Sequence, residues 1–271
     1  MTQSGSLLEV HNLGMRFGGL IAVDGIELNL RPKEIFAIIG PNGAGKTTVF
    51  NCISGFYTPS SGNINLEGQR IDGLGSHSVA RKGIVRTFQN VRLFKTMTAL
   101  ENLLVAQHQH HKASVLAGLF NTASYRKQEQ ESIERAMHWL RYMGIAEFAN
   151  REAGNLAYGH QRRLEIARCM ITEPKLLMLD EPAAGLNPKE TEEMKRFILR
   201  LRGDMNTTIL LIEHDMKLVM GLSDKITVLN YGEKIADGTP DEIRGNERVI
   251  KAYLGVEETD DEESAEEEVR A

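Results

Sequence analysis

Apolar residues along this chain gather in short runs, and segments with helical periodicity lie between several of these runs. The run from Glu34 to Ile39 is almost continuously apolar and ends at Gly40, a pattern typical of a strand buried on both faces of a parallel sheet. Further strands are predicted at residues 83–88, 175–179, 207–212 and 225–229, with helices near 45–54, 162–171 and 188–201. Strands that alternate with helices predict an α/β fold.

Two segments depart from this alternation. Residues 7–30 contain short β-type runs on either side of Gly18 and Gly19. Residues 98–143 show almost no strand signal and predict two or three helices, with a looser piece around residues 108–124. We therefore expect a helical subdomain, inserted into the α/β core at about residues 90–172.

Composition is that of an ordinary globular protein, but the charge is uneven. Of the 271 residues, 41% are hydrophobic and 25% are charged, a composition that argues against disorder of the whole chain. Residues 257–271 carry nine acids and one arginine, which leaves 31 basic and 28 acidic residues in the rest of the chain. A body with a net charge of +3 does not indicate a nucleic-acid partner. Residues 256–271 predict an acidic, disordered tail beside a folded domain at 7–255.

Neither a membrane span nor a secreted disulfide framework is expected. The longest uncharged stretch, Thr47 to Leu66, is interrupted by polar residues and a proline, whereas a spanning helix needs about 20 mostly apolar residues. The first six residues show neither a basic nor an apolar segment, so we expect no secretory signal. Cys52 and Cys169 are far apart and indicate small core residues in a reducing compartment.

A glycine-rich segment after the strand at 34–39 matches the phosphate-binding pattern G-x-x-x-x-G-K-[ST]. Glycines let successive backbone N–H groups face an anion, and the helix that follows adds the positive end of its dipole. Lys46 would reach the β- and γ-phosphates, the Thr47 hydroxyl would coordinate Mg²⁺, and Thr48 would touch the α-phosphate. The predicted nucleotide-binding residues here are Gly40, Pro41, Asn42, Gly43, Ala44, Gly45, Lys46, Thr47 and Thr48.

The second half of such a site is an acid at the end of a buried strand. The apolar run that starts at Leu176 ends in Asp180 and Glu181. Asp180 would hold Mg²⁺ through water, and Glu181 would polarise the attacking water. A GTPase is not supported, because the sequence has no Asn-Lys-x-Asp element to recognise guanine.

With these motifs the chain resembles the ATP-binding subunits of ABC transporters from Leu8 to Gly255. The resemblance implies a P-loop NTPase core with an N-terminal antiparallel β-subdomain and an inserted α-helical subdomain. It also identifies Gln89 with the Q-loop glutamine, His214 with the switch histidine, and Phe17 with the aromatic residue that stacks on adenine. Gln89 would ligate Mg²⁺ or hold the attacking water, and His214 would bond the γ-phosphate.

The segment from Leu156 to Gln161 stands at the family's signature motif but departs from its common Leu-Ser-Gly-Gly-Gln form. Ala157 replaces the serine, Tyr158 the first glycine and His160 the glutamine. Gly159 and the backbone N–H groups at the helix start could still bind an anion. Ala157 and Gly159 are therefore retained as nucleotide contacts, which the resemblance assigns to the ATP held by a partner subunit.

Several strings resemble one branch of the family, the LivG-type ATPases of high-affinity branched-chain amino-acid importers. Among them are Asn155 to Gly159, Pro182 to Thr191 and the final Ala252 to Gly255. The resemblance implies Mg-ATP hydrolysis, a second ABC ATPase subunit in a homo- or heterodimer, two membrane permeases and, indirectly, a periplasmic binding protein. It places the chain peripherally on the cytoplasmic face of the inner membrane.

Other functions stay open at this point. An ABC ATPase for urea or a lipid would share the architecture, and a soluble ABC ATPase acting on DNA or ribosomes would share the motifs. The DNA-repair type needs long coiled-coil heptads, which are not visible, and the ribosomal type usually has two cassettes. A module that binds ATP without turnover is disfavoured by Lys46, Asp180 and Glu181. The segment His108, Gln109, His110, His111 could suggest a metal site, but we favour a polar helix end, since no Cys or acid lies nearby.

Overall fold

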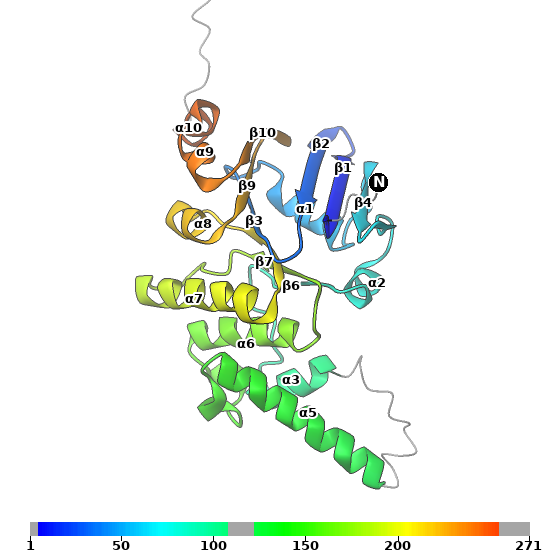
Figure 1. Cartoon of the computed structure of the whole chain (residues 1–271), viewed down its shortest axis with the longest axis vertical. Helices are drawn as coiled ribbons and strands as arrows, with labels where there is room; N and C mark the ends of the chain where they lie inside the picture. Colours follow the sequence, from blue (N-terminus) through cyan, green and yellow to red (C-terminus); the bar gives the residue numbers. More distant parts are fainter. Residues whose placement is uncertain (1–4, 108–121, 255–271) are drawn as a thin grey trace, which may run out of the picture.

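The computed structural model describes residues 5–107 and 122–254, which form two sheets with helices around them (Figure 1). The strands are β1 Leu8–Phe17, β2 Leu20–Leu30, β3 Ile35–Ile39, β4 Ser61–Leu66, β5 Gln69–Arg70, β6 Ile84–Arg86, β7 Leu176–Asp180, β8 Thr208–Ile212, β9 Lys225–Asn230 and β10 Glu233–Gly238. The helices are α1 Lys46–Ile53, α2 Ser76–Arg81, α3 Ala99–Gln107, α5 Ala123–Tyr142, α6 Tyr158–Met170, α7 Pro188–Met205, α8 Met216–Leu222, α9 Pro240–Arg244 and α10 Glu247–Leu254, with short 3₁₀ turns η2 Ala146–Phe148 and η3 Ala153–Asn155.

The larger sheet has the strand order β10-β9-β3-β8-β7-β6. All neighbours in it are parallel except β9 and β10, which form an antiparallel hairpin at one edge. Strand β3 is buried on both faces, as its apolar run predicts: Ile35 and Ile39 pack into a core shared with the helices, and Phe36 and Ile38 into a second core on the other side. The α/β prediction is confirmed.

The smaller sheet is antiparallel, with the order β2-β1-β4-β5. Its apolar side chains, such as Val10, Ile26 and Ile64, pack with Phe50 of α1 and Phe36 of β3 into the second core. Helix α1 therefore lies between the two sheets, as Figure 1 shows. The N-terminal antiparallel subdomain that the resemblance implied is present.

Between β6 and β7 the described residues contain helices and 3₁₀ turns (Figure 1). Trp139 and Leu140 of α5 and Leu164 of α6 pack into the same core as the helix-facing side of β3. Helix α6 begins at Tyr158, earlier than the predicted 162, so it takes in most of the signature segment. Strand β6 ends at Arg86, shorter than the predicted 83–88. The Thr87 N–H still donates to the Met178 carbonyl of β7, whereas the Phe88 carbonyl accepts from the Arg162 side chain of α6.

Helix α7 also exceeds its predicted end at 201 and runs to Met205. Its start is specified locally: Asn187 and Glu190 form a reciprocal capping box, and Pro188 occupies the first turn. The residues 108–111 of the histidine segment and the acidic tail at 256–271 lie outside the described part of the chain. Among the described residues, no helix is both long and apolar enough to cross a membrane.

Candidate active site

The glycine-rich loop joins the carboxyl end of β3 to α1, and its backbone conformation requires glycine at two close contacts. At Gly40 the φ angle is +149°, and a Cβ atom would lie 2.1 Å from the Leu229 carbonyl oxygen. At Gly45 the φ angle is +96°, and a Cβ atom would lie 2.7 Å from the Ala22 carbonyl oxygen. Gly45 is also the N-cap of α1, where no side chain caps the helix. The N–H groups of the first turn are thus left for an anion.

The Lys46 side chain curls over this loop. Its ammonium donates to the carbonyl oxygens of Gly40 at 2.6 Å and Pro41 at 2.8 Å. Burial lowers the pKa of Lys46, and the Glu181 carboxylate acts in the opposite direction. The loop therefore holds a positive charge at the place where the sequence predicts a triphosphate.

A cavity of about 610 Å³ opens over the loop, within the ~300–1,000 Å³ range of small-molecule sites. Its lining combines the predicted phosphate loop with Gln89 and Glu181 and with an apolar rim from β2 and the β9–β10 hairpin. The lining residues are Leu20, Ile21, Ala22, Asn42, Gly43, Ala44, Gly45, Lys46, Thr47, Thr48, Gln89, Glu181 and Tyr231.

Three of the predicted catalytic side chains meet at the Glu181 carboxylate. The Gln89 amide donates to Glu181 Oε2 at 3.2 Å, and His214 Nδ1 lies 3.8 Å from the same oxygen. Glu181 has a φ angle of 47°, a left-handed conformation that costs a non-glycine residue strain, and its N–H donates to the Ile212 carbonyl at 2.9 Å. The neighbouring strands β7 and β8 thus bring Glu181 and His214 together. Glu213, the residue before His214, is buried, and this burial raises the pKa of its carboxyl group. The Glu213 side chain accepts a hydrogen bond from the Ala183 N–H at 2.9 Å.

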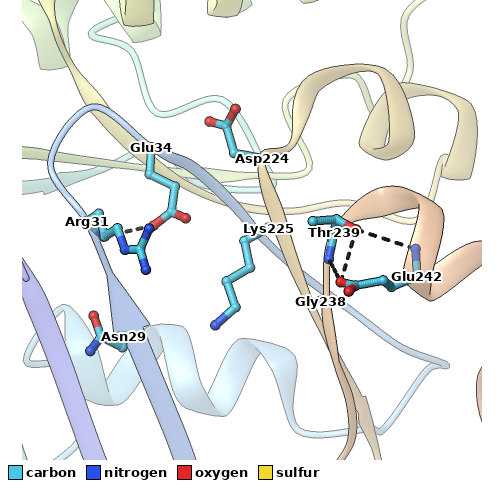
Figure 2. A pocket seen from close by; sticks show the side chains of 8 residues that line it. All are labelled: Asn29, Arg31, Glu34, Asp224, Lys225, Gly238, Thr239 and Glu242. Atoms are coloured by element: carbon cyan, nitrogen blue, oxygen red, sulfur yellow. Dashed lines mark hydrogen bonds between the residues drawn. The ribbon is translucent and has the colours of Figure 1, made fainter.

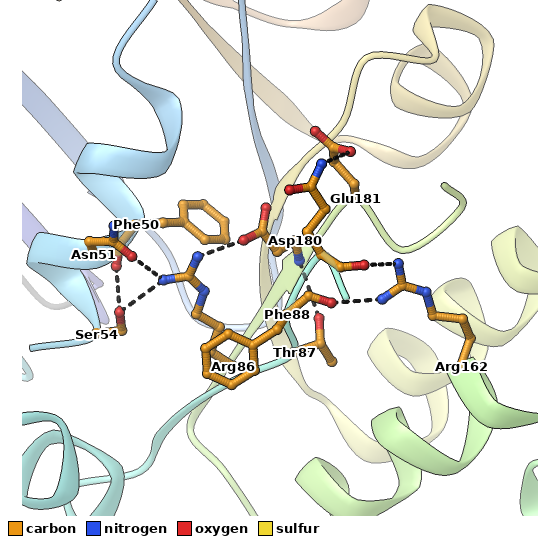
Figure 3. Close-up of polar contacts among 10 residues, drawn as sticks. Phe50, Asn51, Ser54, Arg86, Thr87, Phe88, Arg162, Asp180 and Glu181 are labelled. Atoms are coloured by element: carbon orange, nitrogen blue, oxygen red, sulfur yellow. Dashed lines mark hydrogen bonds and ion pairs between the residues drawn. The ribbon is translucent and has the colours of Figure 1, made fainter. Parts of the chain in front are cut away.

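Asp180 lies beside this cluster and is paired with an arginine that sequence reasoning missed (Figure 3). Arg86 donates to Asp180 Oδ2 at 2.5 Å, and only 7% and 8% of the two side chains are exposed. The same guanidinium donates to Asn51 Oδ1 of α1 at 2.6 Å and to Oγ of Ser54, the C-cap of α1, at 3.3 Å. An arginine at the end of a predicted buried strand, next to the Gln89 segment, was the signal that could have identified it.

A second buried arginine, also missed, attaches the Gln89 segment to α6 (Figure 3). Arg162 donates to the Phe88 carbonyl oxygen at 2.7 Å and to that of Gln89. It also pairs with Glu165 at 3.3 Å, and burial raises the pKa of Glu165. The backbone of residues 88–89 is therefore bonded to the helix that begins with the signature segment.

Another pocket, of about 380 Å³, lies at the opposite end of β3 (Figure 2). Its lining includes two basic residues, Arg31 and Lys225, and three acidic ones, Glu34, Asp224 and Glu242. The pocket therefore has no excess of positive charge to bind a phosphate. Lys225 is further neutralised by Asp237, whose carboxylate lies 2.8 Å away. Ligands of open parallel sheets bind at the carboxyl ends of the strands, and the phosphate loop lies at that end.

The comparisons with known proteins agree with this geometry. The ABC transporter family profile matches residues 23–184, and that of the branched-chain amino acid ATP-binding cassette transporter family matches residues 233–259. The chain is 64% identical to the high-affinity branched-chain amino acid transport ATP-binding protein BraF of Pseudomonas aeruginosa, over 92% of this chain and 98% of that protein. This chain belongs to the ABC transporter ATP-binding family.

Further relatives support the same membership. The LivG protein of Escherichia coli K12, also named a high-affinity branched-chain amino acid transport ATP-binding protein, is 61% identical over 92% of this chain and 98% of its own length. A crystal structure of an ABC transporter ATP-binding cassette in its ADP conformation superposes with a TM-score of 0.80 at 32% identity, covering 92% of this chain and 99% of that one. The P-loop NTPase fold and ATPase activity of this ABC protein follow from its family.

Seven predicted nucleotide contacts of this ABC ATPase do not line the cavity. Gly40 and Pro41 belong to the phosphate loop, and Asp180 and His214 adjoin Glu181. The other three are Phe17, Ala157 and Gly159. Phe17 is 42% exposed and packs edge-on against Tyr57, with ring centroids 5.3 Å apart. Ala157 and Gly159 lie at the start of α6, where a Cβ atom on Gly159 would be 2.9 Å from Glu190 Oε1. Within one chain the structure therefore does not bring the signature segment to the phosphate loop.

An aromatic residue that sequence reasoning missed lines the cavity instead. Tyr231, at the turn between β9 and β10, is 88% exposed and has a φ angle of 46°, which is strained for a bulky residue. The turn is tied to the phosphate loop, since the Gly232 N–H donates to the Ala44 carbonyl at 3.2 Å. The Tyr231-Gly232 pair just after the predicted strand at 225–229 was the available signal, because a glycine in that place favours a tight turn.

Proposed function

We propose that this chain binds and hydrolyses Mg-ATP to drive an importer of the branched-chain amino acids leucine, isoleucine and valine. The observation that carries the proposal is the 61–64% identity to BraF and LivG over 98% of their lengths. Lys46, Gln89 and Glu181 line one cavity, and His214 approaches Glu181. This cluster supports turnover, because it combines a phosphate-binding cation with an oriented carboxylate.

Each residue of the phosphate site has a role in this proposal. Lys46 and the N–H groups of the loop bind the β- and γ-phosphates, and Thr48 contacts the α-phosphate. Glu181 accepts a proton from the attacking water, and Gln89 and His214 orient the Glu181 carboxylate and the γ-phosphate.

The donor set beside the cavity suits magnesium. Thr47 offers a hydroxyl, Asp180 a carboxylate and Gln89 an amide oxygen, and Mg²⁺ prefers oxygen ligands. Bound with the nucleotide, Mg²⁺ would neutralise charge that develops on the phosphates. These three residues would hold it.

The signature segment would act on a second ATPase subunit. Ala157 and Gly159 are remote from the loop of their own chain, and the N–H groups at the start of α6 are free of a side-chain cap. We propose that they cover ATP bound to a partner cassette, in a homo- or heterodimer. Tyr231 would contact the adenine from the rim of the cavity, and Phe17, which lies outside the cavity lining, is the alternative adenine contact that the family resemblance implies.

The remaining partners lie in the membrane and in the periplasm. We propose that two permease subunits dock on the helical segment at about residues 90–172, and that a periplasmic binding protein delivers the amino acid to them. The ATPase would then sit peripherally on the cytoplasmic face of the inner membrane. The Arg162 contacts to residues 88–89 support this coupling, because a shift of the Gln89 segment would move α6.

Uptake of radiolabelled leucine tests the proposal directly. A strain lacking this gene should lose high-affinity leucine uptake and regain it with the wild-type chain but not with Glu181→Gln. The matched control is Glu67→Gln, because Glu67 also has a left-handed φ, 50°, but its side chain is half exposed and pairs with Lys175. Unchanged leucine uptake in the deletion strain, with loss of urea or lipid transport, would reassign the cargo.

A further inference from the structure

Arg86 is buried, although arginine side chains are usually exposed to solvent. It lies on β6 in register with Met178 of β7, and its guanidinium stacks within 5.4–6.0 Å of the ring centroids of Phe50, Phe56 and Phe88. Only 7% of its side chain is exposed, so its positive charge is almost completely shielded from solvent. Because little water reaches the guanidinium, its charge is weakly screened and acts strongly on neighbouring charged groups.

The guanidinium divides its donors between two elements of the nucleotide site (Figure 3). One terminal nitrogen bonds Asn51 of α1 and Ser54, the C-cap of α1, and the other bonds Asp180 Oδ2. The Asp180 N–H in turn donates to Thr87 Oγ1 at 3.2 Å. The carboxylate is therefore fixed in orientation, and one of its two oxygens is already engaged.

We propose that Arg86 is a positioning residue that suppresses binding of free Mg²⁺ to Asp180, so that the metal enters only with nucleotide. This inference rests on the proposed magnesium role of Asp180. A divalent cation near Asp180 meets the fixed positive charge of Arg86 as well as that of Lys46. Nucleotide phosphates add the negative charge that offsets both.

Arginine suits this task better than lysine. Its planar fork carries two terminal nitrogens, which bond Asn51 and Asp180 together. A lysine ammonium would keep the charge but could not bridge the two positions as a fork does.

Binding of Mn²⁺, a spectroscopic substitute for Mg²⁺, tests the proposal without any turnover. Free Mn²⁺ is titrated by electron paramagnetic resonance against the full chain, with and without ADP. We expect the wild type to bind Mn²⁺ weakly without ADP and Arg86→Gln to bind it at least about tenfold more tightly, since a buried counter-charge is removed. The matched control is Arg70→Gln, which breaks an exposed Arg–Asp pair with Asp72 and should change nothing.

Equal Mn²⁺ affinity of Arg86→Gln and wild type without ADP would overturn the inference and leave Arg86 as a structural ion pair. Should Arg86→Gln not fold, Arg86→Met replaces it; this substitution also removes the charge, so its nucleotide-free Mn²⁺ affinity should rise by a similar factor, and an unchanged value overturns the inference equally. Asp180→Asn separates the two levels. If it binds Mn²⁺ with ADP as the wild type does, the magnesium role of Asp180 fails, whatever the Arg86 variants show.

Discussion

The side-chain amide of Gln89 donates a hydrogen bond of 3.2 Å to the Glu181 carboxylate, across 92 positions of sequence. His214 Nδ1 approaches the same oxygen, Oε2, at 3.8 Å. The carboxylate is thus oriented by groups that follow β6 and β8, the two strands on either side of β7. A general base must be held in place before it can take a proton from water, and these contacts supply that restraint.

Replacing Glu181 by glutamine should abolish turnover and keep binding. The substitution retains size and the contact to Gln89 but removes the proton acceptor, so we expect ATP hydrolysis to fall by about 10²–10⁴-fold. Fluorescent-nucleotide titration should give an ATP affinity like that of the wild type, and size exclusion should show an ATP-bound dimer that persists. An ATPase rate equal to that of Glu67→Gln would refute the assignment of the base.

Tyr231 and Phe17 can be distinguished by nucleotide binding. Aromatic stacking on a base is worth about 1–3 kcal/mol when tested by alanine substitution. If Tyr231 contacts adenine, Tyr231→Ala should weaken ADP binding in isothermal titration by about 5- to 150-fold while leaving pyrophosphate binding unchanged. ADP binding of Phe17→Ala serves as the comparison, because the Phe17 ring packs on Tyr57 and does not line the cavity. Equal losses for ADP and pyrophosphate would show that Tyr231 acts on the loop conformation instead.

Removing one partner of the buried Arg162–Glu165 pair should strongly destabilise the folded protein. Both side chains are 2% exposed, so Arg162→Met leaves the buried Glu165 carboxylate without its arginine and removes the donor to the two carbonyls of residues 88–89. The Arg92 N–H would still donate to Glu165. We expect the free energy of unfolding to fall by about 3–5 kcal/mol in urea titration. The double variant Arg162→Met, Glu165→Leu should recover part of this loss. Arg196→Met, in an exposed pair with Glu192, is the control, with an expected effect of about 0.3–0.5 kcal/mol.

The two buried thiols give a prediction about pH. Burial raises the pKa of Cys52 to about 11 and that of Cys169 to about 12. Above pH 9, unfolded thiols lose protons that the folded thiols keep, so the free energy of unfolding should decrease as pH rises from 9 towards 11. Urea titrations at several pH values measure this, and Cys52→Ala should flatten the dependence. In the folded protein neither thiol should react with Ellman's reagent at pH 8, whereas both should react in denaturant.

Much of this site could be predicted because its motifs are local. The strand at 34–39, the glycine loop and the helix from Lys46 follow one another in the chain, so their pattern specifies a phosphate site without knowledge of distant contacts. The boundaries of α6 and β6 were less accurate. Near the end of β6, the carbonyls of residues 88–89 accept from Arg162, a contact between segments more than 70 positions apart that no local pattern indicates.

The α/β class, the phosphate loop and the carboxylates after β7 can be predicted from the chain alone, because neighbouring residues with a fixed period specify each of them. Long-range packing was needed to show that Arg86 pairs with Asp180, 94 positions away, and that Tyr231 rather than Phe17 lines the cavity. Those contacts depend on strand order and on how the β9–β10 hairpin packs beside the loop. Strand order is a result of long-range burial, which no local pattern of residues encodes.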